Sequence, residues 1–177
     1  MRKINNIIII ILIITCYIIG LYNLKHQSLV NFLIDVSVLP IVLLPSVLRK
    51  IKLKISDNLE LMYLIFIILA YFLGTVLNLY DRIPYYDTLM HFLSGAFEGF
   101  IALNICDNKN NITKILFVMG FVSIISICWE IFEFSSSILF KIDPQKVELT
   151  GVTDTMKDLL AALLGGMIIC IKKLKKS

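Results

Sequence analysis

The sequence has few charged residues, few glycines and prolines, and few cysteines. Only 17% of its 177 residues are charged and 58% are hydrophobic, whereas an ordinary soluble domain carries about 25% charged residues. This composition excludes a water-soluble fold. Gly and Pro number 8 and 4, too few for a collagen-like or a Pro/Gly-rich disordered chain. The four cysteines are spread thinly along an apolar chain, which excludes a disulfide scaffold, and they form no Cys-x-x-Cys pair, so we expect each to be a small buried hydrophobe.

Long apolar runs dominate instead, and the mean hydropathy is +0.87. A bilayer core about 30 Å thick needs roughly 20 apolar helical residues, and backbone groups in lipid must be hydrogen-bonded within the segment. We therefore predict an all-α, multi-pass transmembrane helix bundle in the cell membrane, with a single domain over residues 1–177. The six predicted spans cover about residues 4–22, 29–48, 59–80, 87–106, 113–134 or somewhat beyond, and 153–171.

The second predicted span contains polar and helix-breaking residues, namely Asn31, Asp35, Pro40 and Pro45. Proline removes a backbone donor and crowds the preceding turn. The sequence therefore leaves three paths open for this segment: a straight helix, a kinked helix or a re-entrant loop.

The Lys and Arg residues predict the orientation, because positively charged loops stay in the cytoplasm. With both termini inside, 12 of the 17 basic residues fall on the inner side and 5 on the outer side. We therefore predict that both termini are cytoplasmic. The net charge of +4 does not indicate nucleic-acid binding, since in a membrane protein the side of each charge matters more than the sum. The bilayer is the partner that we expect.

Three pairs of ionisable residues lie inside predicted spans, where each residue costs a few kcal/mol and is a candidate functional group. Spacings of three or four residues place each pair on one helix face. With the predicted orientation, all three pairs lie in the outer third of the membrane, which predicts one shared polar site near the outer face. The candidate catalytic residues are Asp87 and His91, Glu130 and Glu133, and Asp154 and Asp158.

Helix capping is the structural alternative for part of this set. Asp87 and Asp154 stand at predicted helix starts, where a carboxylate caps backbone N–H groups and complements the helix dipole. Capping explains these two residues as well as chemistry does. It does not explain Glu130 and Glu133, which lie toward a helix C-terminus where the dipole disfavours anions. A purely structural polar network remains the alternative for the whole set.

Two helix starts also share a weak internal repeat. Asp87-Thr-Leu-Met-His-Phe-Leu-Ser-Gly aligns with Asp154-Thr-Met-Lys-Asp-Leu-Leu-Ala-Ala, and sites in membrane proteins often lie between repeated halves. Three further acidic residues fall within spans, and one of them, Glu60, lies at the edge of its span. Asp35 is expected at the depth of the site if the second span is real. Glu98 lies deeper, as either a further member of the site or a hydrogen-bonded packing residue.

Five carboxylates and one imidazole at one depth cannot all be ionised without cations, because like charges disfavour each other. A divalent metal would resolve this, and we assign His91, Glu130, Asp154 and Asp158 as its candidate ligands. Carboxylate oxygen plus histidine suits Zn, Mn, Mg or Fe. A metal with a nearby carboxylate base activates water for hydrolysis, so the enzyme class that fits is a metal-dependent hydrolase. Lipid or lipid-linked envelope molecules are the natural substrates at an outer leaflet.

Two other function classes stay open. The first is a non-catalytic membrane protein that binds a lipid or a protein partner through the polar cluster. The second is a transporter, which the sequence disfavours, because apart from Glu98 the inner halves of the spans lack the polar residues that a conduction path needs.

Three motifs carry a resemblance to a known group of proteins. They are Tyr86-Asp87-x-x-x-His91-Phe-x-x-Gly95, Trp129-Glu130-x-x-Glu133-Phe and Asp154-Thr155-x-x-Asp158-Leu, in this order on successive spans. The pattern resembles the VanZ-like bacterial membrane proteins, and more closely their uncharacterised YjdF-type relatives, over about residues 59–171. The resemblance implies a helical, envelope-associated membrane protein. Where VanZ-type proteins tend to carry Gln and Asn, this chain has Glu133 and Asp158, so its site is more acidic.

Overall fold

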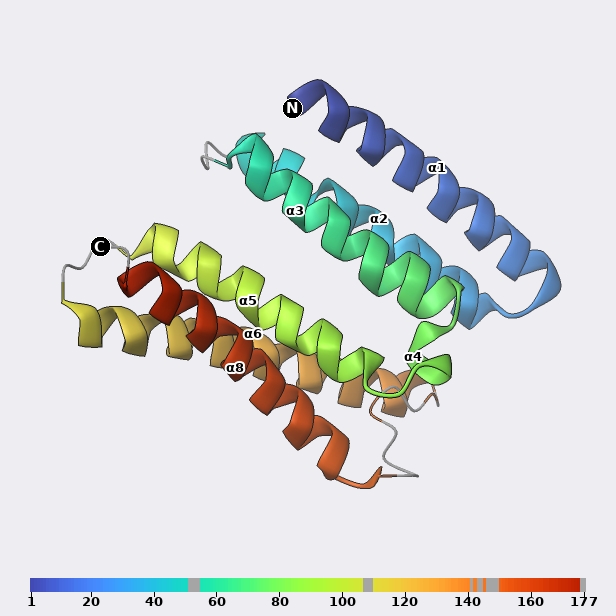
Figure 1. The fold of residues 1–177 in the computed structure, drawn as a ribbon. Coiled ribbons are helices and arrows are strands. Elements are labelled where there is room, and N and C mark those ends of the chain that lie inside the picture. The colour runs from blue at the N-terminus through green and yellow to red at the C-terminus, as the bar shows by residue number, and fades with distance from the viewer. Residues whose placement is uncertain (51–54, 107–109, 141, 143–144, 146–149, 176–177) are drawn as a thin grey trace. The chain divides into compact units, whose positions relative to one another are not determined.

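The computed structural model describes residues 1–50, 55–106, 110–140, 142, 145 and 150–175. Across these residues the regular structure consists of seven α-helices and one π-helical segment, which confirms the all-α prediction. Five helices are long and apolar enough to cross a membrane. The protein is therefore a multi-pass membrane protein with five candidate spans (Figure 1).

The chain divides into two compact units, Met1–Leu77 and Asn78–Ser177. The prediction of one domain over the whole chain stays a prediction, and each unit is described by itself. The first unit contains three apolar helices, the third of which continues into the π-helical segment. These elements are α1 (Arg2–His26), α2 (Leu29–Lys50), α3 (Asp57–Ile67) and η1 (Ile68–Val76).

Helix α2 runs through both Pro40 and Pro45, so the re-entrant path for the second predicted span is wrong. Membrane helices tolerate proline because neighbouring groups satisfy the freed backbone carbonyls. Helix α3 begins with a side-chain cap, in which Ser56 Oγ accepts a hydrogen bond from the Leu59 N–H at 3.2 Å. The core of this unit is formed by Ile9, Leu12, Cys16, Val38, Val42, Leu64, Ile67 and Tyr71.

The second unit holds the three predicted polar pairs. Three of its helices pack against one another, and a fourth, one-turn helix precedes them. The third predicted span ends at Val76 rather than Tyr80, and Asn78 then adopts a left-handed conformation with φ of 58°. The elements of this unit are α4 (Leu79–Arg82), α5 (Tyr86–Ile105), α6 (Asn111–Phe140) and α8 (Thr153–Leu174).

Helices α5 and α8 approach each other as closely as backbones can. A Cβ added at Gly95 would lie 1.9 Å from the Ala162 carbonyl oxygen, and one at Gly99 would lie 2.9 Å from the Gly166 Cα. Small residues permit this approach in membranes, where van der Waals packing drives helix association. The contacts advance along both helices together, so α5 and α8 run parallel and the first turn of one lies beside the first turn of the other.

The sixth predicted span is a helix of 22 residues, α8, but it is not among the five most apolar candidates. Charged residues stand at both of its ends, with Asp154, Lys157 and Asp158 at the start and Lys172 and Lys173 at the finish. Six spans and cytoplasmic termini therefore stay predictions. Six of the lysines that contribute to the orientation argument lie outside the described residues, namely Lys52, Lys54, Lys109, Lys141, Lys146 and Lys176.

Candidate functional site

The site residues of α5 occupy its first two turns. Asp87 lies in the first turn and His91 one turn further along. The His91 Nε2 is 3.7 Å from Asp87 Oδ1. The residues at the N-cap positions of α5 and α8 are Tyr85 and Val152, and neither forms a side-chain cap hydrogen bond. The place of Asp87 and Asp154 in the first turn complements the positive end of the helix dipole.

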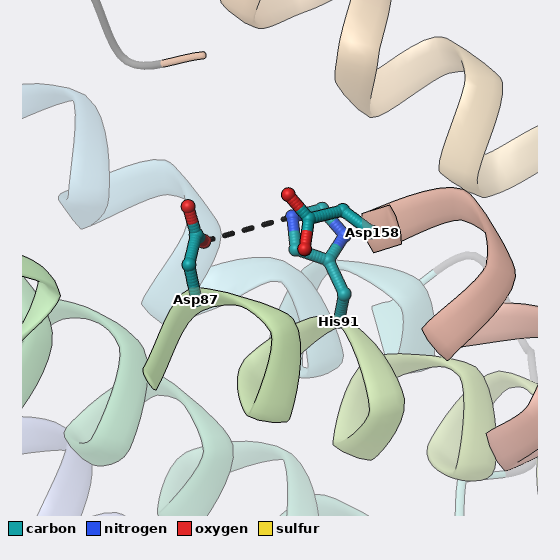
Figure 2. A group of neighbouring side chains, drawn as sticks. All are labelled: Asp87, His91 and Asp158. Atoms are coloured by element: carbon teal, nitrogen blue, oxygen red, sulfur yellow. Dashed lines mark ion pairs between the residues drawn. The ribbon is translucent and has the colours of Figure 1, made fainter. Parts of the chain in front are cut away.

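Helix α8 brings Asp158 to the same imidazole. One ligand atom each of Asp87, His91 and Asp158 lies within 4.8 Å of the other two, and Figure 2 shows the three side chains converging from two helices. Asp158 is 3% exposed, and its Oδ1 has no hydrogen-bond partner among the described residues. The Thr88 side chain hydrogen-bonds to the same carboxylate.

Helix α6 supplies a second group around the same histidine. His91, Glu130 and Glu133 each offer a ligand atom within 4.8 Å of the others, and the Glu130 Oε1 is 4.0 Å from His91 Nε2. Glu130 is buried and its Oε1 accepts no hydrogen bond within the part of the chain that the structure describes. The Trp129 Nε1–H donates to Glu133 Oε1 at 2.9 Å. His91 therefore stands between two acidic groups from three helices.

Five of the six predicted site residues thus belong to one of two groups that share His91. Asp154, which the sequence assigned as a metal ligand, belongs to neither group. Its Oδ2 is buried without a hydrogen-bond partner among the described residues, so it adds negative charge beside the cluster. Asp87 and Glu133, which were candidate catalytic residues but not candidate ligands, each belong to one of the two groups that could hold an ion.

Sequence reasoning missed Gln145. This buried residue lies between α6 and α8, and its Nε2–H₂ group donates to the Glu130 carbonyl oxygen at 3.2 Å and to Glu130 Oε2 at 2.9 Å. The amide therefore holds one oxygen of Glu130 and leaves the other facing His91. Helical periodicity ends before this connection, so no spacing rule could have found it.

The internal repeat coincides with the register of helix packing. Residues related by the repeat lie side by side, since Gly95 packs against Ala162 and the same offset of the chain pairs Gly99 with Gly166. One turn earlier, the same offset pairs His91 with Asp158, which share a group of ligand atoms. The close approach of small residues thus brings the polar positions of the two repeats to one level.

Glu98 and Asp35 have partners of their own. Glu98 is buried in α5, and its Oε1 accepts a hydrogen bond from the Ser94 hydroxyl at 2.6 Å. It belongs to neither group around His91. Asp35 lies in the first unit, where it accepts hydrogen bonds from the Tyr71 hydroxyl at 2.6 Å and from the Asn23 amide at 2.8 Å.

Comparison with known proteins finds a family whose model matches nearly the whole chain. A family model described as "Predicted membrane protein (DUF2238)" matches residues 4–174. The chain belongs to this family. A protein of Thermotoga maritima, described as "Uncharacterized protein", is similar to this DUF2238 member, with 30% identity over 119 residues. The match covers 63% of this chain and 59% of the relative, so it spans about three fifths of the relative's length. No solved structure matches this DUF2238 protein.

Proposed function

We propose that the cluster around His91 binds a divalent metal ion and that the protein uses this ion on a lipid-type substrate of the cell envelope. The observation that carries the proposal is that one imidazole belongs to two groups of ligand atoms. Each group also contains a buried carboxylate oxygen without a hydrogen-bond partner among the described residues, on Asp158 and on Glu130. A buried anion is costly unless it is paired or coordinates a metal.

The donor set supports a catalytic rather than a purely structural metal. Structural zinc sites use cysteine or histidine in closed tetrahedra, whereas this cluster offers one imidazole and an excess of carboxylates. A metal held here would supply the activation of water for hydrolysis of an ester or phosphoester bond. A carboxylate of the cluster that is not a ligand would take up the proton of the water and return it to the departing alcohol oxygen. Asp154, which belongs to neither group of candidate ligands, is the candidate for this base.

The depth of the site supports a substrate from the membrane. Every group of the cluster lies on helices whose outward faces are apolar, and the motif resemblance to VanZ-like proteins supports an envelope-associated role. A lipid or lipid-linked molecule already lies in the bilayer beside these apolar helix faces. A metal-dependent hydrolase of such a molecule is the function that we propose.

Metal analysis of the detergent-purified protein tests the proposal. The chain has two histidines, so His91→Ala has a matched control in His26→Ala, at an exposed position of α1. We expect stoichiometric metal in the parent and in His26→Ala, and its loss in His91→Ala. A metal-free parent protein, or full metal retention in His91→Ala with an unchanged affinity, would overturn the metal site.

The one tryptophan provides a second measurement. Trp129 donates to Glu133, so a metal that takes the Glu133 carboxylate must alter this hydrogen bond and with it the Trp129 fluorescence. Titration of chelator-treated protein with Zn²⁺ or Mn²⁺ should therefore give a saturable change that acid weakens, because protons compete for the ligands. His91→Ala should abolish the change at the same metal concentrations.

A further inference from the structure

A groove on the second unit begins at the candidate site and opens on an apolar helix face. It lies between α6 and the start of α8 and has a volume of about 390 Å³, within the range of small-molecule pockets. Its walls are apolar and are formed by Ile127, Ile131, Phe134, Val152 and Leu159.

The walls belong to a surface that faces hydrocarbon in a membrane. Ile131 and Phe134 are 58% and 56% exposed, and both lie on the candidate span α6. Large apolar side chains this exposed on a membrane helix contact acyl chains. An occupant of the groove therefore enters from the bilayer, and its contacts with these walls must be those of a hydrocarbon chain.

The groove also has polar lining residues, and it shares one of them with the cluster. Glu130, Gln145 and Thr155 line it, and Glu130 is the carboxylate whose Oε1 lies 4.0 Å from His91 Nε2. One residue thus belongs both to the groove and to a group of candidate metal ligands. A molecule whose chain follows the walls places its polar end beside the metal ligands.

We propose that the groove binds one acyl chain of a phospholipid and that the lipid's phosphate group lies against the metal site. The identification rests on the proposed function, because the carboxylates of the cluster repel a phosphate when no cation is present. A bound divalent ion makes the electrostatic interaction of the cluster with a phosphate attractive. Phosphate oxygen is a hard, anionic ligand of the kind that such an ion prefers. The substrate class of the site is accordingly a membrane lipid with an accessible phosphate.

Spin-labelled lipids in phosphatidylcholine nanodiscs test this proposal. Phosphatidic acid and phosphatidylcholine, each labelled on the same acyl chain, are compared by the motionally restricted fraction of the electron spin resonance spectrum. We expect a larger restricted fraction for phosphatidic acid, because its phosphate is accessible to the ion. Removal of metal with a chelator should lower this fraction to the phosphatidylcholine value.

Variants that fill the groove test the binding of the acyl chain independently of the binding of the metal. Ile131→Trp adds an indole to the groove wall, and Ile124→Trp adds one to the same helix at a position that is 65% exposed and does not line the groove. We expect loss of the phosphatidic acid preference in Ile131→Trp, full preference in Ile124→Trp, and stoichiometric metal in both. Val152→Trp fills the groove from the opposite wall and gives the same expected loss if Ile131→Trp does not fold.

The outcomes distinguish failure of this inference from failure of the proposed function. Equal preference for phosphatidic acid in the groove variants and in Ile124→Trp, with metal present, would overturn the groove as the lipid site and leave the metal site standing. A preference that survives chelation would overturn the metal–phosphate contact. Absence of metal from the parent protein would overturn the proposed function and, with it, this assignment of the headgroup.

Discussion

Buried acidic residues occur in both units, and those of the first unit have partners that offset their charge. Glu60 is fully buried, forms an ion pair with Arg49 and accepts a hydrogen bond from the Asn5 amide at 2.8 Å. Asp35 has a hydrogen bond on each oxygen, from Tyr71 and from Asn23. The acidic residues of this unit are tied to neighbouring helix surfaces, as structural polar groups in a membrane are.

The acidic residues of the second unit crowd around a single imidazole. Asp87, Glu130 and Asp158 all approach His91, and among the described residues neither Glu130 nor Asp158 forms an ion pair with Lys or Arg. A buried carboxylate can be part of the fold only if a cation or hydrogen-bond donors compensate it. The contrast teaches that the number of buried charges does not identify a site, whereas the convergence of several carboxylates on one imidazole does.

The largest effect is expected from a substitution that forces α5 and α8 apart at the close contact between them. Gly95→Ala would place a Cβ 1.9 Å from the Ala162 carbonyl oxygen, and a backbone atom cannot rotate away as a side chain can. We expect a loss of stability of about 3 kcal/mol or more and loss of metal binding, because α5 and α8 carry ligands on opposite sides of this contact. Thermal unfolding in detergent and metal content measure the two effects.

Gly120→Ala is the matched control for that variant. Gly120 lies in α6, and a Cβ there would meet nothing within 4 Å, so the substitution should be neutral or stabilise the helix by roughly 0.5–1 kcal/mol. Equal stability of Gly95→Ala and Gly120→Ala would show that the close contact between α5 and α8 is not what positions the cluster.

The second prediction removes the charge of a buried acidic residue in the first unit that pairs with an arginine. Glu60→Gln leaves Arg49 without its charged partner, and we expect a destabilisation of about 3 kcal/mol with unchanged metal content. Asp57→Asn removes the exposed ion pair with Arg2 and should cost less than about 1 kcal/mol. Thermal unfolding of both variants checks the difference, and loss of metal from Glu60→Gln would contradict a purely structural role for the first unit's acids.

The sequence predicts the helices of this protein well because, in a bilayer, each apolar segment must satisfy its backbone hydrogen bonds within itself. Six apolar runs became helices, and even α2 kept its helix through Pro40 and Pro45. Lipid exposes every unpaired backbone group to a medium without hydrogen bonds, so a run of apolar residues has few alternatives. Helix α8 carries charged residues at both ends, and for this reason it is not among the five helices whose length and composition make them candidate spans.

The site could be predicted only as far as helix periodicity reaches. Spacings of three and four residues place Asp87 beside His91, and parallel α5 and α8 bring Asp158 to the same level. Which carboxylates share an ion depends on rotamers and on helix rotation, which spacing does not encode. Gln145 lies in a connection without period, and its contact with Glu130 depends on the path of that connection.

The third prediction compares two aspartates with the same burial and expects their substitution by asparagine to change the stability of the protein in opposite directions. Asp35 and Asp158 are each 3% exposed. Asp35→Asn replaces an acceptor of two hydrogen bonds by an amide that can keep only one, at a cost of about 1–2 kcal/mol. Asp158→Asn removes one negative charge from a crowded group, which should stabilise the metal-free protein by about 1 kcal/mol.

Thermal unfolding in buffer with a chelator checks both signs, because no metal then offsets the charge of the cluster. Added Zn²⁺ or Mn²⁺ should raise the melting temperature of the parent and of Asp35→Asn more than that of Asp158→Asn, which has lost a candidate ligand. Destabilisation by Asp158→Asn in the metal-free protein would place this residue with the structural acids of the first unit.

The smallest expected effect concerns the residue that orients a ligand without being one. Gln145→Ala removes both hydrogen bonds to Glu130 and leaves the carboxylate free to turn away from His91. Groups that orient metal ligands typically contribute 10–100-fold in affinity, and we expect a loss of about tenfold because the other ligands keep their positions. Asn104→Ala removes a side-chain amide from α5, where it donates to the Phe100 carbonyl, and should leave the affinity unchanged. Titration of Trp129 fluorescence with Zn²⁺ compares the two variants. Equal affinities would mean that the helix backbone alone fixes Glu130, unlike the first unit, where side-chain donors hold Glu60 and Asp35.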